Sequence, residues 1–259
     1  MMLPAPSMMT DLVKLSRGTS MDNGWGHSAQ AWIDSVGERG DWGREHVLDP
    51  AMLARISYGR FRNALDVGCG EGRFCRLLKE RGIAATGIDP TEALLETARR
   101  RDPAGDYRFG RAEQLDFESA SFDLVVSYVT LVDIVDFRTV IRKMERVLRP
   151  GGVVLIANLN GFASAGAAQG WVKDEAGRHL HFPVDRYLDE HPFWIAWAGI
   201  RIENWHRPLS AYMAAFLEAG LNLTYFAEPA PVSGDAAHQE RAWRLPWFVV
   251  MEWQKPVVA

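Results

Sequence analysis

The stretch Ala64-Leu65-Asp66-Val67-Gly68-Cys69-Gly70-Glu71-Gly72-Arg73-Phe74 decides the fold of this 259-residue chain. An apolar run enters a glycine-rich turn, and apolar residues then recur at helical spacing, which predicts a strand, a tight loop and a helix. Gly68, Gly70 and Gly72 lack the β-carbons that would hold a ligand away from the backbone. The N-terminus of the following helix offers unpaired N–H groups, so the stretch predicts a nucleotide-binding loop.

A second short apolar run, residues 84–88, leads into Asp89, twenty-one residues after Gly68. A carboxylate at the end of a second strand can accept hydrogen bonds from both hydroxyls of a ribose. We therefore expect Asp89 to bind the ribose of a cofactor and Pro90 to lie beside it.

These residues resemble the first two motifs of the class I S-adenosylmethionine-dependent methyltransferases of small-molecule type. Asp66 stands where that family holds the amino-acid end of its cofactor, and the loop reads GxGxG rather than the dinucleotide spacing GxGxxG. Residues 110–117 and 121–127 resemble the family's adenine-side loop and fourth strand, and residues 148–154 resemble the turn into its fifth strand. These motifs follow in family order over residues 60–160.

The resemblance implies S-adenosylmethionine as cofactor and assigns further contacts to it. Ala112 and Glu113 are expected on the adenine side, because Arg111 replaces the aspartate that many members carry and cannot accept from the adenine amino group. Ser127 and Tyr128 stand at the end of the fourth strand, and the aromatic face of Tyr128 suits a sulfonium cation.

Residues 21–58, ahead of the first strand, are expected to form a helical cap. Apolar residues between 25 and 36 fall on one helical stripe, and Asp49-Pro50 predicts a second helix with the aspartate as its cap. In the family such helices often close over the cofactor; the alternative is that they only cover the edge of the sheet. Trp32 and Arg44 are the candidate contacts to cofactor or substrate.

Strands and helices alternate over residues 59–259, which predicts an α/β fold with a doubly wound, Rossmann-like parallel sheet. The resemblance implies seven strands in the order 3-2-1-4-5-7-6, with the last strand antiparallel. A helix is expected over 137–148, and a polar loop before a final strand at 247–253. Residues 160–207 break the alternation and are rich in aromatic side chains, so we interpret them as an insertion, which in the family covers the substrate.

A hydroxyl or protonated amine acceptor must lose a proton during methyl transfer, and histidine is a natural general base. His206 is the first candidate, because its His-Arg-Pro-Leu stretch resembles one found in many small-molecule members; a structural or capping histidine is the alternative. His181 and Tyr187 are the remaining catalytic candidates.

The substrate-binding candidates lie in the same insertion: Trp194, Trp197, Tyr187 and Arg207. The aromatic residues among them suit a flat acceptor; the alternative is that each packs the insertion. Arg207 suits a substrate carboxylate, with a solvated surface arginine as the alternative. A metal site at His179, His181 and Asp185 has the right ligand types, but a polar loop explains them equally well, and no metal is expected.

The composition of the chain limits the kinds of partner that we expect it to bind. The net charge of −4 and the lack of a lysine and arginine run disfavour nucleic acid, and no stretch has the roughly 20 apolar residues of a membrane span. The two cysteines, Cys69 and Cys75, suit a reducing compartment. We expect a loose tail at 1–20 and a cytoplasmic enzyme with a small-molecule substrate, either a monomer or a homodimer.

Three other functions stay open at the level of sequence. A tRNA or protein methyltransferase requires a basic groove on the folded surface. A protein that binds the cofactor without turnover would have an occluded acceptor pocket. An NAD-dependent oxidoreductase would place nicotinamide where the sulfonium binds, and the position of Asp66 argues against it.

Overall fold

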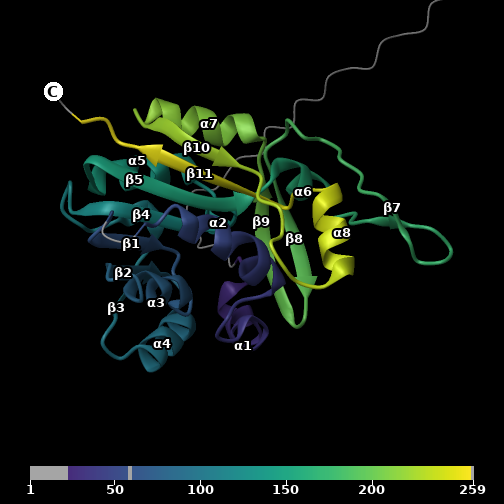
Figure 1. Ribbon diagram of the computed structural model, residues 1–259, viewed down its shortest axis with the longest axis horizontal. Helices are drawn as coiled ribbons and strands as arrows, with labels where there is room; N and C mark the ends of the chain where they lie inside the picture. The colour runs from purple at the N-terminus through teal and green to yellow at the C-terminus, as the bar shows by residue number, and fades with distance from the viewer. Residues whose placement is uncertain (1–22, 58–59, 258–259) are drawn as a thin grey trace, which may run out of the picture.

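A computed structural model describes residues 23–57 and 60–257, so the tail expected at 1–20 lies outside the described residues. The main strands are β1 (Asn63–Val67), β2 (Ala84–Asp89), β3 (Asp106–Phe109), β4 (Phe122–Tyr128), β5 (Leu148–Leu159), β10 (Asn222–Ala227) and β11 (Phe248–Gln254). They form one seven-stranded sheet in the order β10-β11-β5-β4-β1-β2-β3 (Figure 1). Strand β11 runs antiparallel to both of its neighbours, so the predicted order and the antiparallel last strand are confirmed.

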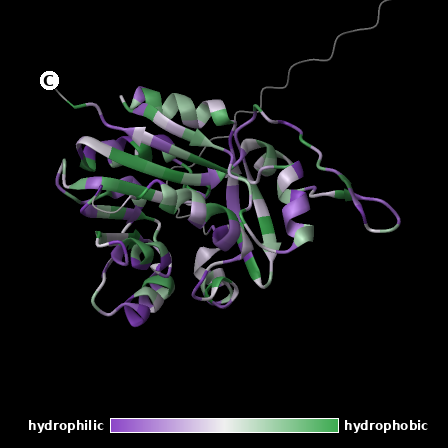
Figure 2. Cartoon of the chain, in the orientation of Figure 1, coloured by the Kyte–Doolittle hydropathy of each residue, from purple (hydrophilic) through white to green (hydrophobic). Residues whose placement is uncertain are grey.

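Helices cover both faces of this sheet: α3 (Arg73–Lys79), α4 (Glu92–Arg101), α5 (Phe137–Val147) and α7 (Leu209–Glu218). On one face, Ile141 of α5 and Phe216 of α7 share an apolar cluster with Val125 of β4. On the other face, Phe74 of α3 packs in a cluster with Leu124 of β4. The central strands are buried on both sides, which explains their nearly continuous apolar sequences (Figure 2).

The segment before β1 folds as α1 (Trp25–Val36), the π-helical turn η1 (Arg44–Leu48) and α2 (Asp49–Ala54). The expectation that Asp49 caps a helix is wrong, because helical backbone already begins at η1 and the Asp49 side chain makes no cap hydrogen bond. Its carboxylate instead accepts bidentate hydrogen bonds from the Arg73 guanidinium at 2.7–2.8 Å and one hydrogen bond from the Tyr128 hydroxyl at 2.7 Å.

The insertion contains α6 (Gly161–Gly166) and two hairpins, β6 (Val172–Lys173) with β7 (His179–His181), and β8 (His191–Trp197) with β9 (Ile200–His206). The second hairpin lies against α1: Ile200 and Ile202 share an apolar cluster with Trp32 and Ile33. Its strand β9 also brings Asn204 against the turn η3 (Leu131–Asp133), which follows β4.

One element boundary and one helix differ from the predictions. Leu148, expected as the last helical residue, begins β5 instead. Helix α8 (Ala236–Arg244) forms where a polar loop was expected, and the Asp235 carboxylate caps it by accepting from the His238 amide at 3.0 Å. Within residues 23–57 and 60–257, no helix has both the length and the apolar character needed to cross a membrane.

Candidate functional site

A cavity of about 590 Å³ opens at the carboxyl ends of β1, β2 and β4, where ligands bind in open α/β sheets. Its walls come from α1, the glycine loop, the short helix η2 (Ala112–Gln114), η3 and β9. Most of the predicted cofactor contacts line it: Asp66, Gly68, Gly70, Asp89, Pro90, Ala112, Glu113, Tyr128, Trp32 and Arg44.

Two predicted cofactor contacts, Gly72 and Ser127, are not among the residues that line this cavity. Gly72 has φ +76°, and a β-carbon there would lie 2.6 Å from the Tyr107 ring, so glycine is needed for backbone geometry and packing. Ser127 is fully buried, and its hydroxyl has no hydrogen-bond partner within the described part of the chain.

Asp66 is a buried carboxylate on β1. The side chain is only 1 % exposed, and its Oδ2 accepts a weak hydrogen bond from the Cys75 thiol at 3.5 Å. Its Oδ1 has no hydrogen-bond partner within residues 23–57 and 60–257. Burial raises the pKa of Asp66 to about 7, outweighing the thiol hydrogen bond, and the nearby carboxylates of Asp89 and Glu71 add to the rise. A cationic ligand group would satisfy this oxygen, so the residue fits an ammonium.

The glycine loop and Asp89 form a cradle next to Asp66. Oδ2 of Asp89 accepts from the Gly70 amide at 3.0 Å, and Oδ1 accepts from the Thr91 amide at 2.8 Å. Gly70 has φ +55°, and a β-carbon added there would meet nothing within 4 Å. Because each carboxylate oxygen can accept a further hydrogen bond, the cradle fits a ribose that approaches the bare backbone.

The arginines in the cavity wall are already paired with carboxylates. Arg44 bonds Asp41, while its guanidinium lies 4.6 Å from the Trp32 ring centre and 5.5 Å from that of Tyr128. Arg73 bonds Asp49, and Arg111 lies 3.4 Å from Glu113. These wall cations therefore carry little uncompensated positive charge toward a ligand.

His206 is fully buried and is not among the residues lining the cavity. Its Nε2 lies 2.9 Å from the Tyr187 carbonyl oxygen, and its Nδ1 lies 2.7 Å from the Ser164 hydroxyl. Burial lowers the pKa of His206, which favours the neutral ring, donating from Nε2 and accepting at Nδ1. With both nitrogens engaged, the ring links β9 to α6 and to the backbone at Tyr187 within the insertion.

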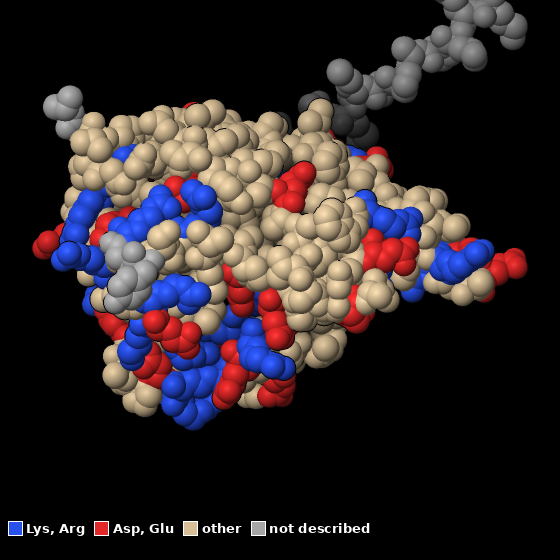
Figure 3. All heavy atoms as spheres, in the orientation of Figure 1, with Lys and Arg blue, Asp and Glu red and all other residues tan. Residues whose placement is uncertain are grey.

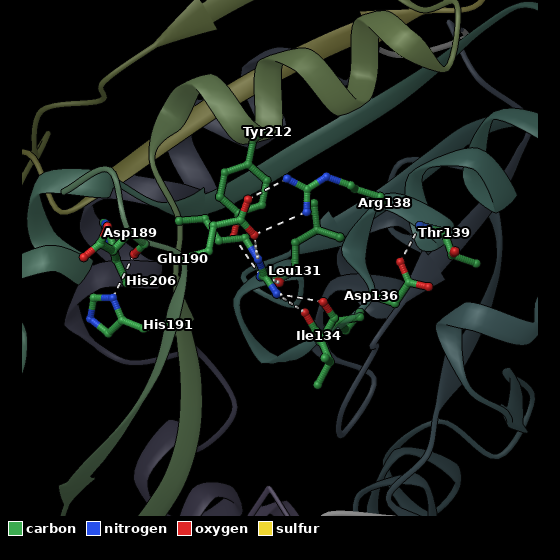
Figure 4. Close-up of polar contacts among 12 residues, drawn as sticks. Leu131, Ile134, Asp136, Arg138, Thr139, Asp189, Glu190, His191, His206 and Tyr212 are labelled. Atoms are coloured by element: carbon green, nitrogen blue, oxygen red, sulfur yellow. Dashed lines mark hydrogen bonds and ion pairs between the residues drawn. The ribbon is translucent and has the colours of Figure 1, made fainter. Parts of the chain in front are cut away.

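Arg207 is 1 % exposed, so its interpretation as a solvated surface residue is wrong. Its guanidinium donates to the backbone carbonyls of Leu131 at 3.1 Å, Ile134 at 2.6 Å and Val135 at 3.0 Å. Its Nε lies 3.5 Å from the carboxylate of Glu190, which Figure 4 labels beside Leu131 and Ile134. Arg207 thus fixes the segment that carries η3 into the cavity wall.

The aromatic candidates of the insertion also lie outside the cavity lining. Trp194 and Trp197 are 39 % and 40 % exposed on β8, and Trp194 stacks on the Arg201 guanidinium at 4.1 Å. The Tyr187 ring stacks on Phe162, with ring centres 5.1 Å apart. The structure therefore does not bring these three side chains to the predicted cofactor contacts.

The polar insertion residues weighed as metal ligands do not form a cluster. Among residues 23–57 and 60–257, no group of three or more His, Cys, Asp or Glu side chains has metal-binding geometry. His179 instead packs its ring edge-to-face with Trp171, with ring centres 5.5 Å apart.

On the face shown in Figure 3, lysine and arginine are interspersed with aspartate and glutamate over the helices below the sheet.

Sequence reasoning missed Asp133, which lines the cavity from η3. Its carboxylate accepts hydrogen bonds from the Asn204 amide and from the side chain of Trp25. Burial raises the pKa of Asp133 to about 8, although these two hydrogen bonds lower it. Its place just after the carboxyl end of β4 was the one available signal, since its partners are distant in sequence.

Comparisons with known proteins show which proteins this chain is similar to. The family described as "Methyltransferase domain" matches residues 65–156. The chain is 30% identical over 183 residues to the malonyl-[acyl-carrier protein] O-methyltransferase of Enterobacter lignolyticus, covering 69% of this chain and 71% of that protein. It is 31% identical over 171 residues to the ubiquinone biosynthesis O-methyltransferase of Idiomarina loihiensis, covering 60% and 69%. The crystal structure of an S-adenosylmethionine-dependent methyltransferase from Mesorhizobium loti superposes with a TM-score of 0.70 at 28% identity, covering 80% of this chain and 96% of that one.

Proposed function

We propose that this chain, which belongs to the S-adenosylmethionine-dependent methyltransferases, methylates oxygen or nitrogen of a small aromatic or heterocyclic acceptor. The observation that carries the proposal is the buried, unsatisfied Oδ1 of Asp66 beside the Asp89 cradle in one cavity. That pair suits a ligand with an ammonium at one end and a ribose nearby.

The chain's own residues would hold the cofactor at several points. Asp66 would pair with the ammonium, Asp89 would accept the ribose hydroxyls, and Gly70 would allow close approach of the backbone. Ala112 and Glu113 would border the adenine. The bound cofactor supplies a methyl group on a sulfonium, and aromatic faces attract such a cation by about 0.5–2 kcal/mol.

Methyl transfer by in-line displacement needs alignment and exclusion of water more than a strong acid. Apolar side chains are among those that line the cavity, and they suit a flat ring: Trp25, Trp32, Val36, Ile134 and Val135. An oxygen acceptor has further support, since the relatives from Enterobacter lignolyticus and Idiomarina loihiensis are both named O-methyltransferases.

The test has two stages. Calorimetric titration should show binding of S-adenosylmethionine and of S-adenosylhomocysteine, with NAD as the control that does not bind. Phenols, carboxylic acids, aromatic amines and N-heterocycles should then be screened for transfer of a labelled methyl group. Binding of NAD alone, or transfer to a protein or tRNA but to no small molecule, would contradict the proposal.

A further inference from the structure

We infer that Asp133 receives the proton of an aromatic hydroxyl acceptor, while Trp25 and Asn204 hold its carboxylate in position. The inference rests on the methyl transfer proposed above and assigns the acceptor class to the cavity. It gives a role to a side chain that neither the motifs nor the resemblance singled out.

The backbone after β4 turns Asp133 toward the cavity. Val129, the first residue after the strand, has φ +57°, a left-handed conformation that β-branched residues rarely adopt. Its amide donates to the Ala157 carbonyl at 2.8 Å, which holds the turn in place. Strain of this kind persists only where the surrounding structure enforces it, and it clusters at functional sites.

The partners of Asp133 are neutral donors. Asn204 and Trp25 can each donate a hydrogen bond but cannot neutralise a carboxylate. The wall cations Arg44, Arg73 and Arg111 are paired with other carboxylates, as described above. A carboxylate oriented by neutral donors keeps its capacity to take up a proton, whereas a partner lysine or arginine would suppress it.

The neighbouring wall suits a flat ring. The rings of Trp25 and Trp32 meet edge-to-face, with centres 5.1 Å apart, and both side chains line the cavity. Because the Trp25 side chain is bonded to Asp133, the aromatic wall and the carboxylate form one continuous surface. An aromatic acceptor lying against this surface would direct a ring hydroxyl toward the carboxylate.

The charged groups near Asp133 come from several elements. Asp89 at the end of β2 raises its pKa and Arg44 on η1 lowers it, after the dominant effect of burial. Glu203 on β9 also lines the cavity, and Arg207 binds the carbonyls on either side of Asp133. With its pKa raised to about 8, the Asp133 carboxyl group is protonated below that pH and ionised above it. A bound sulfonium cation lowers this pKa, so that the carboxylate is also present at lower pH.

The hydroxyl oxygen forms a bond to the methyl carbon, and the carbon–sulfur bond breaks with its electron pair remaining on sulfur. The hydroxyl proton passes to an oxygen of the Asp133 carboxylate. The products are a methyl ether, a neutral thioether and a protonated carboxyl group, so no other reactant is needed.

The test compares two phenols that differ in whether a base is required. Catechol is protonated at neutral pH, whereas 4-nitrocatechol is largely ionised and needs no base. Asp133→Asn should slow single-turnover transfer to catechol by about 10²-fold or more and leave transfer to 4-nitrocatechol within a few fold of wild type. Its affinity for S-adenosylhomocysteine should stay within about threefold of wild type, as expected if a charge-assisted contact to that ligand is not lost.

Asp136→Asn is the matched control, because this exposed aspartate caps α5 and asparagine caps a helix equally well. Equal losses with both phenols, or no loss with catechol, would overturn the role of Asp133. A wild type that binds S-adenosylhomocysteine but methylates neither phenol would overturn the hydroxyl assignment alone. Failure to bind that ligand would instead remove the proposed function.

The wild-type pH profile is a second test that needs no variant. Transfer to catechol should fall with decreasing pH below an apparent pKa at or under about 8, as Asp133 becomes protonated. A rate that stays constant down to about pH 5 would contradict proton transfer to this carboxylate.

Discussion

Replacing Asp66 with asparagine should affect stability and cofactor binding in opposite directions. The side chain is buried, its Oδ2 accepts from the Cys75 thiol, and its Oδ1 has no hydrogen-bond partner in the described part of the chain. Asparagine has the same shape: its carbonyl oxygen can keep the thiol hydrogen bond while its amide takes the place of Oδ1. The substitution therefore removes a buried charge without opening a cavity.

The expected stabilisation follows from the pKa. A rise from 3.8 to about 7 means that the folded chain binds the proton more tightly than the unfolded chain. The stability contributed by this group is therefore fully present below about pH 4 and is lost as the pH rises through about 7. At about 1.36 kcal/mol per pKa unit, the cost at pH 8 is about 4 kcal/mol at most. Asp66→Asn removes that cost, so its gain in unfolding free energy should be larger at pH 8 than at pH 5.

The affinity of Asp66→Asn for S-adenosylmethionine should fall. Losing a buried charge partner of the cofactor ammonium costs about 2–4 kcal/mol, which is a weakening of about 30- to 1,000-fold. Denaturant titrations of the empty protein at pH 5 and pH 8, with calorimetry of S-adenosylmethionine, measure both effects, and Asp136→Asn again serves as the control. An equal change in stability at both pH values, or an unchanged affinity, would refute the reasoning.

Three further substitutions test other parts of the site. Asp89→Ala should weaken S-adenosylmethionine binding by about 1–3 kcal/mol in calorimetry, because two ribose hydroxyls lose their acceptor; an unchanged affinity would remove that role. Gly70→Ala should lower cofactor affinity at least about tenfold, since its β-carbon would occupy open space at the cavity wall and its backbone is left-handed, and full affinity would show that the ligand lies elsewhere. Arg207→Met should cost about 3–5 kcal/mol of unfolding free energy in denaturant titration, because three backbone carbonyls lose their donor at about 1–3 kcal/mol each, while Glu190 keeps Arg138 as a partner; unchanged stability would contradict this account.

The sheet could be predicted because its signals are local. Apolar runs of strand and helix period, together with the glycine turn after Asp66, identify the strands and helices. These patterns depend on residues that are close in sequence, so they can be recognised without knowledge of the tertiary contacts. Helix α8 was missed because it is short and polar, and none of its nine residues is buried in the core. Its capping residue, Asp235, lies in a segment of proline, glycine and aspartate that is typical of loops.

The acceptor side was harder to predict because its contacts link distant segments. Arg207 binds carbonyls more than 70 residues away, and a sequence does not reveal whether an arginine is buried with such partners. Asp49 follows the pattern of a helix cap, yet its carboxylate is used by Arg73 and Tyr128. Asp133 depends on Asn204, a residue in a different hairpin, so its position becomes visible only in the folded chain.

The most direct test of the central claim is a crystal structure of the protein with S-adenosylhomocysteine. We predict that its ammonium lies within hydrogen-bond distance of Asp66 Oδ1, that its ribose hydroxyls contact Asp89, and that its sulfur faces the part of the cavity lined by Tyr128 and Asp133. A ligand bound outside this cavity, or a ribose turned away from Asp89, would contradict the account.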